Sequence, residues 1–220
     1  MLELAVKNNV KGFLLTSTSE VYGQVGNIIP TPETFHGLVN SYGPRSMYDE
    51  GKRAAEAYAY SFFQKYQVPI RIARIFNTYG PRLDVNSTSQ YGRVIVKFIS
   101  QALSNSPITV YGDGNQTRSF CYITDLIEGL MKLLLSPGLD GMILNLGNQR
   151  ETKILDIANL IIKLVNSNSS ITFKPLPEDD PLRRSPDLTN AKKLLKFSNR
   201  VDLEDGLSRT IDWMKEADIK

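Results

Sequence analysis

The chain has 220 residues, with 26 Lys and Arg against 23 Asp and Glu, for a net charge of +3 at pH 7. So small an imbalance argues against a nucleic-acid partner. The single cysteine, Cys121, excludes an internal disulfide framework, and the lone His36 has no neighbouring histidine for a metal. No run approaches the roughly 18 apolar residues of a membrane span, so we expect a cytoplasmic protein without a membrane partner.

The first part of the chain predicts a parallel sheet. Residues 2–9 indicate the end of an amphipathic helix, and residues 12–16 form a short apolar run typical of a buried strand. Ser46 is a candidate N-cap for a helix that ends at Pro69, and residues 70–75 read as the next strand. Strand, helix and strand in this order predict a βαβ unit with helices on the faces of its sheet.

The pattern beyond residue 77 predicts a second, smaller α/β lobe. Thr124 or Asp125 is expected to cap one of its helices. We expect further helices at 91–104, at 189–197 and at 203–216, together with one helix that runs through residue 135 and one that ends at residue 165. We expect strands at 108–111, 142–146 and 171–173.

Two short motifs carry the chemistry. Tyr48 and Lys52 are four positions apart and share one helix face, and an ammonium held beside a phenol favours the phenolate. This makes Tyr48 a usable base near neutral pH, whereas the alternative is a solvated pair on a helix surface. Tyr22 and Tyr48 are expected to frame the hydroxyl and carboxylate groups of residues 16–20, which could handle a sugar.

Four blocks, taken together, resemble a known family. Residues 17–23, the Tyr48–Lys52 pair, residues 74–81 and residues 110–114 resemble the extended short-chain dehydrogenase/reductases that modify nucleotide sugars. Within that family the chain looks most similar to the UDP-glucuronate decarboxylases. The blocks that carry this closer likeness are residues 43–53, 73–82, 92–94 and 116–122.

The resemblance implies an α/β fold with a partial Rossmann-like parallel sheet and a smaller C-terminal substrate-binding lobe. Residues 1–80 would form the C-terminal part of the NAD-binding domain. Residues 81–220 would mainly form the nucleotide-sugar lobe, with about 115–150 returning to the core. The sequence contains no G-x-G-x-x-G turn for the NAD pyrophosphate, so the first βαβ units are expected to be missing. A truncated gene model, a fragment and a natural short form that cannot hold NAD alone all remain open.

The same resemblance implies a reaction and a cofactor. The family uses NAD to oxidise the sugar C4 hydroxyl, with Tyr48 taking the proton and Lys52 contacting the nicotinamide ribose. Thr18 would hydrogen-bond the C4 oxygen, and Thr78 would lie on the cofactor side. The C4 ketone then allows the C6 carboxylate to leave as CO2, which gives UDP-xylose after re-reduction.

Ser19 and Glu20 discriminate between subclasses of the family. The related 4,6-dehydratases carry an Asp-Glu pair here, because elimination of water needs an acid for the leaving hydroxyl. Ser19 is a poor acid, which favours decarboxylation, although 4-epimerases also lack that Asp. Glu20 could alternatively be a helix cap or part of a loop salt bridge.

The resemblance also implies a set of substrate contacts for the UDP-sugar. Arg93 and Arg118 could instead be surface charges, and Arg184 cannot be separated by sequence from the adjacent Arg183. Arg184 is the arginine that would lie near the sugar, as a contact to its carboxylate or as a proton donor. The expected substrate-binding residues are Asn77, Arg93, Tyr111, Gln116, Arg118 and Arg184.

The resemblance further implies a homodimer. Family members pair through the helix that carries Tyr48 and its neighbour, and the aromatic residues Tyr58, Tyr60, Phe62 and Phe63 fit either such an interface or core packing. Without its first strands the sheet would have an exposed edge, so we expect poor solubility or dimerisation. A non-catalytic protein that keeps only the sugar-nucleotide lobe is the alternative to an enzyme.

Overall fold

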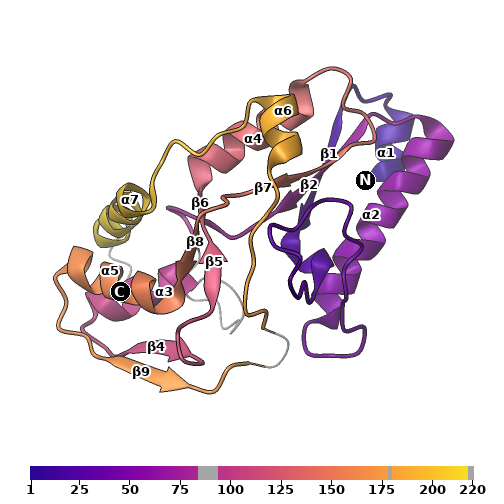
Figure 1. Cartoon of the computed structure of the whole chain (residues 1–220). Coiled ribbons are helices and arrows are strands. Elements are labelled where there is room, and N and C mark those ends of the chain that lie inside the picture. The colour runs from indigo at the N-terminus through magenta and orange to yellow at the C-terminus, as the bar shows by residue number, and fades with distance from the viewer. Residues whose placement is uncertain (84–93, 178–179, 218–220) are drawn as a thin grey trace.

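The computed structural model describes residues 1–83, 94–177 and 180–217. Its central element is a parallel sheet in the order β1–β2–β7, formed by β1 (Phe13–Thr18), β2 (Ile70–Ile75) and β7 (Ile143–Leu146) (Figure 1). All three strands run in the same direction, so their carboxyl ends meet at one edge of the sheet. The α/β fold with a parallel sheet that the sequence predicts is therefore confirmed.

Helices cover both faces of this sheet (Figure 1). α1 (Leu2–Lys7) and α2 (Ser46–Tyr66) pack on one face, and α4 (Ile123–Leu135) and α6 (Thr189–Leu195) pack on the other. Side chains of β2 alternate between these layers: Ile70 and Ile72 join the cluster with α2, whereas Ala73 joins the cluster with α4. Each fully buried isoleucine contributes roughly 1.5–3 kcal/mol to stability.

The second lobe has its own core. α3 (Val94–Leu103) and α5 (Ile154–Val165) pack against the parallel pair β4 (Ile108–Tyr111) and β9 (Ile171–Lys174), and α7 (Leu203–Glu216) packs on α3 and α5. Two short ladders join the lobe to the sheet region. They are the parallel pair β3 (Thr78–Tyr79) and β6 (Cys121–Tyr122), and the antiparallel pair β5 (Thr117–Ser119) and β8 (Glu151–Lys153).

Two predicted helix caps are wrong. Ser46 is the first residue of α2 and its hydroxyl donates to the Gly43 carbonyl at 2.8 Å, so it does not cap the helix amides. Asp125 lies inside the first turn of α4 and accepts hydrogen bonds from the backbone amides of Arg200 and Val201 at 3.0 and 3.1 Å. A carboxylate near a helix start can satisfy a distant loop instead of its own helix, and sequence spacing does not distinguish the two.

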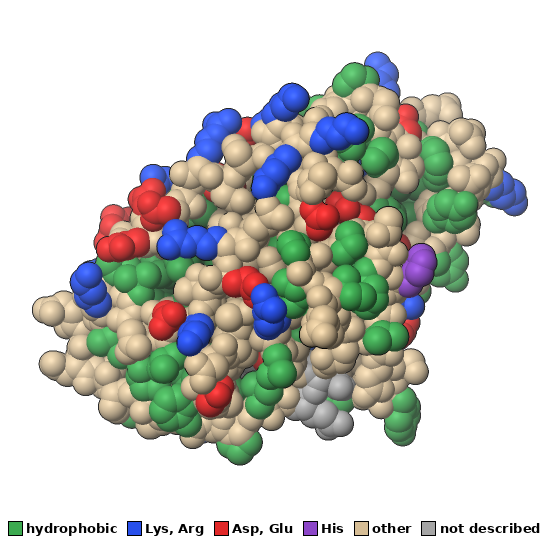
Figure 2. Space-filling model, viewed as in Figure 1, with side chains coloured by type: hydrophobic (Ala, Val, Ile, Leu, Met, Phe, Trp, Pro, Cys, Tyr) green, Lys and Arg blue, Asp and Glu red, His purple; other side chains and the backbone are tan. Residues whose placement is uncertain are grey.

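The surface carries both signs of charge. On the face shown in Figure 2, Asp and Glu side chains lie among Lys and Arg side chains. Within the described ranges, no helix is both long and apolar enough to cross a bilayer. The same residues contain no group of three or more His, Cys, Asp and Glu side chains that could hold a metal ion.

Candidate active site

A cavity of about 1140 Å³ lies where the carboxyl ends of β1 and β2 face the second lobe. Open parallel sheets bind ligands at this edge, because helix starts and strand ends converge there. One side of the cavity, here the catalytic wall, is formed by residues 16–20, 44–45, 47–49 and Lys52. The opposite side, here the lobe wall, is formed by residues from α3, β4 and β5, with Asn77 and Thr78 between the two.

Tyr48 and Lys52 lie on the catalytic wall, as their spacing predicts. Both come from α2, and the Tyr48 side chain is half exposed at the cavity. The Lys52 ammonium donates to the carbonyl of Thr16, in the C-terminal half of β1, at 2.9 Å. It lies 5.9 Å from the centre of the Tyr48 ring. The strand therefore fixes the cation next to the phenol.

Thr18, Ser19 and Glu20 follow at the end of β1, where the short helix η1 (Ser19–Tyr22) begins. The Thr18 hydroxyl accepts a hydrogen bond from the Glu20 amide at 3.3 Å, so Thr18 caps η1. Gly23 ends η1 with φ +54, and a Cβ there would lie 2.0 Å from the Leu38 carbonyl oxygen. Only glycine allows this approach, which holds the cluster against the loop behind it.

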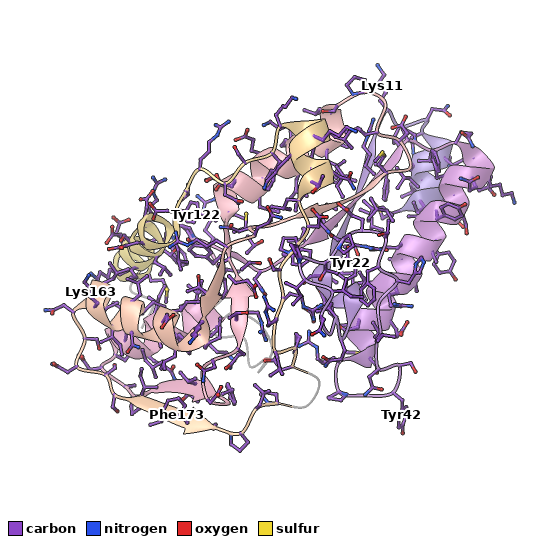
Figure 3. All side chains as sticks on the ribbon, in the orientation of Figure 1. Lys11, Tyr22, Tyr42, Tyr122, Lys163 and Phe173 are labelled. Carbon is purple, nitrogen blue, oxygen red and sulfur yellow. The ribbon has the colours of Figure 1, made fainter. Side chains whose placement is uncertain are left out.

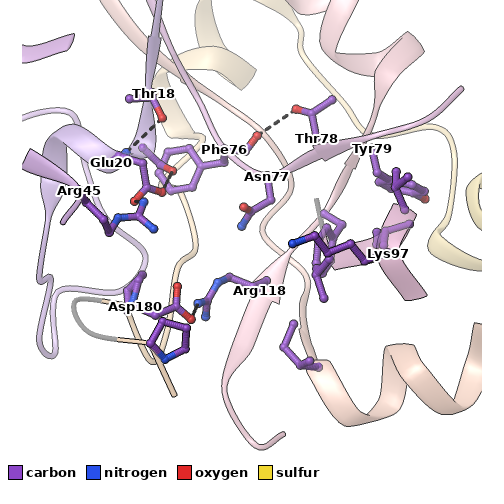
Figure 4. A pocket seen from close by; sticks show the side chains of 18 of the residues that line it. Thr18, Glu20, Arg45, Phe76, Asn77, Thr78, Tyr79, Lys97, Arg118 and Asp180 are labelled. Carbon is purple, nitrogen blue, oxygen red and sulfur yellow. Dashed lines mark hydrogen bonds and ion pairs between the residues drawn. The ribbon is translucent and has the colours of Figure 1, made fainter. Parts of the chain in front are cut away.

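Two arginines surround the Glu20 carboxylate. Arg45 forms an ion pair with it, and the Arg184 guanidinium lies 3.2 Å from Glu20 Oε2 (Figure 4 shows Glu20 and Arg45). Arg184 also donates to the Ser19 carbonyl at 2.6 Å. Burial lowers the pKa of the Arg184 guanidinium, and the charge of Glu20 opposes this shift. Glu20 is thus held in position by cations on two sides.

The structure places the two adjacent arginines in different environments. The Arg184 side chain is 2% exposed behind Ser19 and Glu20 and does not line the cavity. The Arg183 side chain is 54% exposed and pairs with Glu151 at 2.5 Å. Arg184 therefore does not face the cavity directly, and its contacts reach the cavity only through Ser19 and Glu20.

Asp49 is a member of the site that the sequence pattern missed. Its side chain lines the cavity, is 7% exposed, and has Oδ2 3.7 Å from Nε of Arg45. Its other oxygen, Oδ1, is buried and has no hydrogen-bond partner among the described residues. Burial raises the pKa of this carboxyl. The i,i+4 spacing of Arg45 and Asp49 is the sequence feature that could have indicated this residue.

Polar side chains on the lobe wall and beside it line the cavity. Asn77 Nδ2 and Gln116 Oε1 are buried and unpaired within the part of the chain that the structure describes. Gln116 donates through Nε2 to the Tyr111 carbonyl at 2.5 Å, and both residues line the cavity. Arg118 lines it too, and its guanidinium pairs with Asp180 at 2.9 Å (Figure 4).

Other predicted residues have mixed outcomes. Thr78 lines the cavity, and its hydroxyl donates to the Phe76 carbonyl at 2.9 Å (Figure 4). Arg93 lies outside the described residues. Lys97, which the sequence pattern did not single out, extends from α3 toward the space between Asn77 and Arg118 (Figure 4). The available signal was a lysine as the one charged residue between Val94 and Leu103, in a mainly apolar helix.

The expectation that Tyr22 frames the site is wrong. Its side chain is fully buried in the interior, and its hydroxyl donates to Asn145 Oδ1 at 2.7 Å (Figure 3). The Arg74 guanidinium lies 4.8 Å from the ring centre, and Arg74 pairs with Glu56 at 2.7 Å. Burial raises the pKa of Tyr22 to about 12, against the opposing effect of Arg74. Tyr22 ties η1 to β7 and takes no part in the cavity.

The family model of the NAD dependent epimerase/dehydratase family matches residues 1–147. The chain belongs to this family. It is 47% identical over 207 residues to UDP-glucuronic acid decarboxylase 2 of Arabidopsis thaliana, covering 94% of this chain and 45% of the relative. It is also 47% identical over 213 residues to UDP-glucuronic acid decarboxylase 1 of Danio rerio, covering 97% and 49%. The chain thus spans about half the length of these curated relatives.

Solved structures of the family have the same fold. A UDP-glucose 4-epimerase from Thermotoga maritima, solved with UDP-glucose, matches with a TM-score of 0.90 at 27% identity. It is matched over 98% of this chain and 67% of its own length. A UDP-glucuronic acid 4-epimerase from Bacillus cereus, in complex with UDP-glucuronic acid and NAD, matches with a TM-score of 0.83 at 30% identity, over 98% and 65%. The Rossmann-like fold is therefore shown from both sequence and structure.

Proposed function

We propose that this chain carries the catalytic and sugar-binding part of an NAD-dependent UDP-glucuronate decarboxylase, which forms UDP-xylose. One observation carries the proposal. The site combines Tyr48 and Lys52, which serve oxidation at a hydroxyl, with Ser19 where dehydration would need an acid. The similarity to decarboxylases over nearly the whole chain supports it independently.

The residues present fit the nicotinamide end of NAD. The Lys52 ammonium and the half-exposed Tyr48 phenol lie together at the carboxyl edge of the parallel sheet, where dinucleotides bind in such folds. Lys52 would hold the ribose hydroxyls, and Thr78 lies on the same side of the cavity. When NAD is bound, it supplies the hydride acceptor at the sugar C4 and later the hydride donor.

Tyr48 and its neighbours supply the proton transfers and the positioning. Tyr48, as the base, takes the proton of the C4 hydroxyl, while the Thr18 hydroxyl holds the C4 oxygen. A ketone at C4 lies β to the C6 carboxylate, so the electrons of the C5–C6 bond pass into an enolate as CO2 leaves. Protonation of this enolate at C5 then gives the carbon skeleton of the product. Ser19 lies beside the departing carboxylate without adding a negative charge.

The lobe wall would bind the UDP part of the substrate. Asn77 Nδ2 and Gln116 Oε1 lack partners among the described residues, and a ligand that pairs them would relieve a buried cost of about 1–3 kcal/mol each. Arg118 offers a guanidinium for the diphosphate, and Tyr111 an aromatic ring for the base. Arg93 is proposed as a further diphosphate contact from its place in the family motif alone.

The experiment is incubation of the chain with UDP-glucuronate and NAD⁺, with separate detection of CO2 and UDP-xylose. Both products are expected in equal amounts. Conversion to UDP-galacturonate without CO2 would identify a 4-epimerase, an outcome to which the structural similarity to the Bacillus cereus enzyme gives weight. Binding of UDP-glucuronate without turnover, in the presence of NAD⁺, would identify a sugar-nucleotide binding protein without catalysis.

We further propose a homodimer formed through α1 and α2. Tyr58 and Tyr60 on α2 are 66% and 63% exposed, and Leu4 on α1 is 54% exposed. Large exposed apolar side chains on two neighbouring helices favour burial against a second copy. Sedimentation at micromolar concentration is expected to give the mass of a dimer. A stable monomer at every concentration would refute the dimer without affecting the proposed chemistry.

A further inference from the structure

Four charged side chains form one cluster, with three of them on the catalytic wall and Arg184 behind it. Glu20 comes from η1, Arg45 and Asp49 come from the start of α2, and Arg184 comes from the segment before α6. Arg45 links the two acids, and Arg184 reaches Glu20 from behind. Two positive and two negative charges cancel, so the cluster is neutral before any ligand enters.

The two carboxylates in this cluster are not equivalent. Glu20 accepts from Arg45, from Arg184 and from the Ser19 hydroxyl at 3.4 Å. Asp49 is approached by Nε of Arg45 through Oδ2 alone, and its buried Oδ1 has no partner within the described residues. An ionised, buried oxygen without a donor is costly, whereas a protonated carboxyl can itself donate. Since Oδ2 faces Arg45, a proton on Asp49 belongs on Oδ1.

The charges that face Asp49 come from each element packed around it. Arg45 lies one turn earlier on the helix, Glu20 approaches from η1, and Arg184 contributes from behind Glu20. Lys52, one turn later, is bonded to the Thr16 carbonyl. Burial outweighs the two arginines and raises the pKa of Asp49 in the free protein. Asp49 is therefore the member of the cluster whose charge is least stabilised.

We propose that Asp49 takes up one proton from solvent when an anionic sugar enters the cavity, and that this uptake lets the site accept a sugar carboxylate. The inference rests on the proposed function, which places that carboxylate beside Ser19. A third carboxylate next to a neutral cluster would leave a net negative charge in a buried place. Protonation at Oδ1 restores neutrality and turns the unpaired oxygen into a donor.

Calorimetric titration with UDP-glucuronate, in two buffers of different ionisation enthalpy, measures the uptake directly. Close to one proton is expected per sugar bound at a pH between the pKa of Asp49 in the free protein and its higher pKa in the complex. As the pH rises across that interval, the affinity for UDP-glucuronate falls by up to about tenfold per pH unit. UDP-glucose, which has no carboxylate, is expected to bind without uptake.

Variants on one helix assign the proton. Asp49→Asn is expected to bind UDP-glucuronate without uptake and with an affinity that does not change with pH. Asp49→Glu keeps a titratable group and is expected to keep the uptake. Glu50→Gln is the matched control, because Glu50 is the next residue, is 41% exposed, pairs with Arg53 and does not line the cavity. Circular dichroism verifies that each variant is folded.

The outcomes separate this inference from the function on which it rests. Uptake that persists in folded Asp49→Asn would overturn the role of Asp49, and decarboxylation by the same protein would leave the proposed function standing. Decarboxylation by the unaltered chain without any proton uptake would overturn the inference alone. Binding of UDP-glucose but not of UDP-glucuronate, or of neither, would overturn both.

Discussion

The two walls of the cavity are built on opposite principles. On the catalytic wall, the charged groups that surround Glu20 already have partners inside the protein, and Lys52 is bonded to β1. On the lobe wall and beside it, Gln116 and Asn77 each keep a buried polar atom unpaired among the described residues. The first wall is prepared before the ligand arrives, and the second is completed by it.

This difference fits the division of labour that catalysis requires. Groups that stabilise a transition state act best when they are held in place beforehand, because no reorganisation is then needed during the reaction. Groups that recognise the remote part of a substrate can rely on atoms that only the ligand satisfies. Asp49 is the exception on the catalytic wall, since one of its oxygens resembles the unpaired atoms opposite.

The largest effect is expected for Tyr48→Phe. Loss of the hydroxyl removes the proposed base, and general-base catalysis contributes about 10²–10⁴-fold to a rate. We expect kcat for CO2 release to fall by about 10³-fold, while the dissociation constant for UDP-glucuronate changes by less than about threefold. Tyr60→Phe, an exposed tyrosine of the same helix, is the control and should retain full activity. A large loss of binding with little loss of kcat would instead mean that Tyr48 binds the substrate and is not the base.

The Tyr48–Lys52 pair is also the part of the site that sequence could locate best. An i,i+4 spacing places two side chains together once the helix is recognised, and the run of residues 70–75 marks the following strand. Arg183 and Arg184 could not be separated, because the side on which adjacent loop residues point depends on the path of the whole loop. That Asp49 Oδ1 has no partner among the described residues depends on packing from three elements, which no local pattern encodes.

The fold shows the same limit. The strands β1, β2, β4, β7 and β9 follow apolar runs and lie close to where the sequence predicts them. The strands β3, β5, β6 and β8 have two or three residues each and were missed, because so short a segment has no periodicity of its own. They exist because neighbouring segments bring them together. Tyr22 was misassigned for a related reason: its place beside the motif in sequence does not reveal that η1 turns it inward.

The next largest effect concerns stability, and it tests whether the catalytic wall is held by buried ions. Arg184→Met leaves the Ser19 carbonyl and part of Glu20 without a buried partner, so the free energy of unfolding should fall by about 3–5 kcal/mol. Arg183→Met removes an exposed pair and should cost at most about 1 kcal/mol. Urea denaturation followed by circular dichroism measures both. Equal losses for the two variants would contradict the distinction drawn between them.

A smaller effect is expected at alkaline pH, behind the catalytic wall. The pKa of Tyr22 is raised from 10 to about 12 in the folded state, so its contribution to stability is complete below pH 10 and is lost as the pH rises toward 12. Between pH 9 and 11 the unaltered chain should lose roughly 1 kcal/mol more than Tyr22→Phe. Denaturant titrations at the two pH values measure this difference. Tyr58→Phe, on the exposed face of α2, should behave like the unaltered chain.

The smallest effect addresses the lobe wall, where Arg118 has a partner that a ligand could replace. Asp180 occupies the Arg118 guanidinium at 2.9 Å, and its side chain is 24% exposed. Such a pair is worth about 0.2–1 kcal/mol, so Asp180→Asn should tighten the binding of UDP by at most about fivefold. Titration calorimetry with UDP measures the change, and Asp140→Asn, which alters an ion pair with Arg71, is the control.

The direction of the change in UDP affinity shows whether Asp180 competes with phosphate or holds Arg118 in place. If phosphate and Asp180 compete for Arg118, the gain from Asp180→Asn should shrink as salt is added, because screening weakens the competing carboxylate as well as the phosphate contact. Weaker UDP binding in Asp180→Asn would instead mean that Asp180 holds Arg118 in its binding position. Arg118 would then be prepared in advance like Glu20, and the contrast between the two walls would hold only for Asn77 and Gln116.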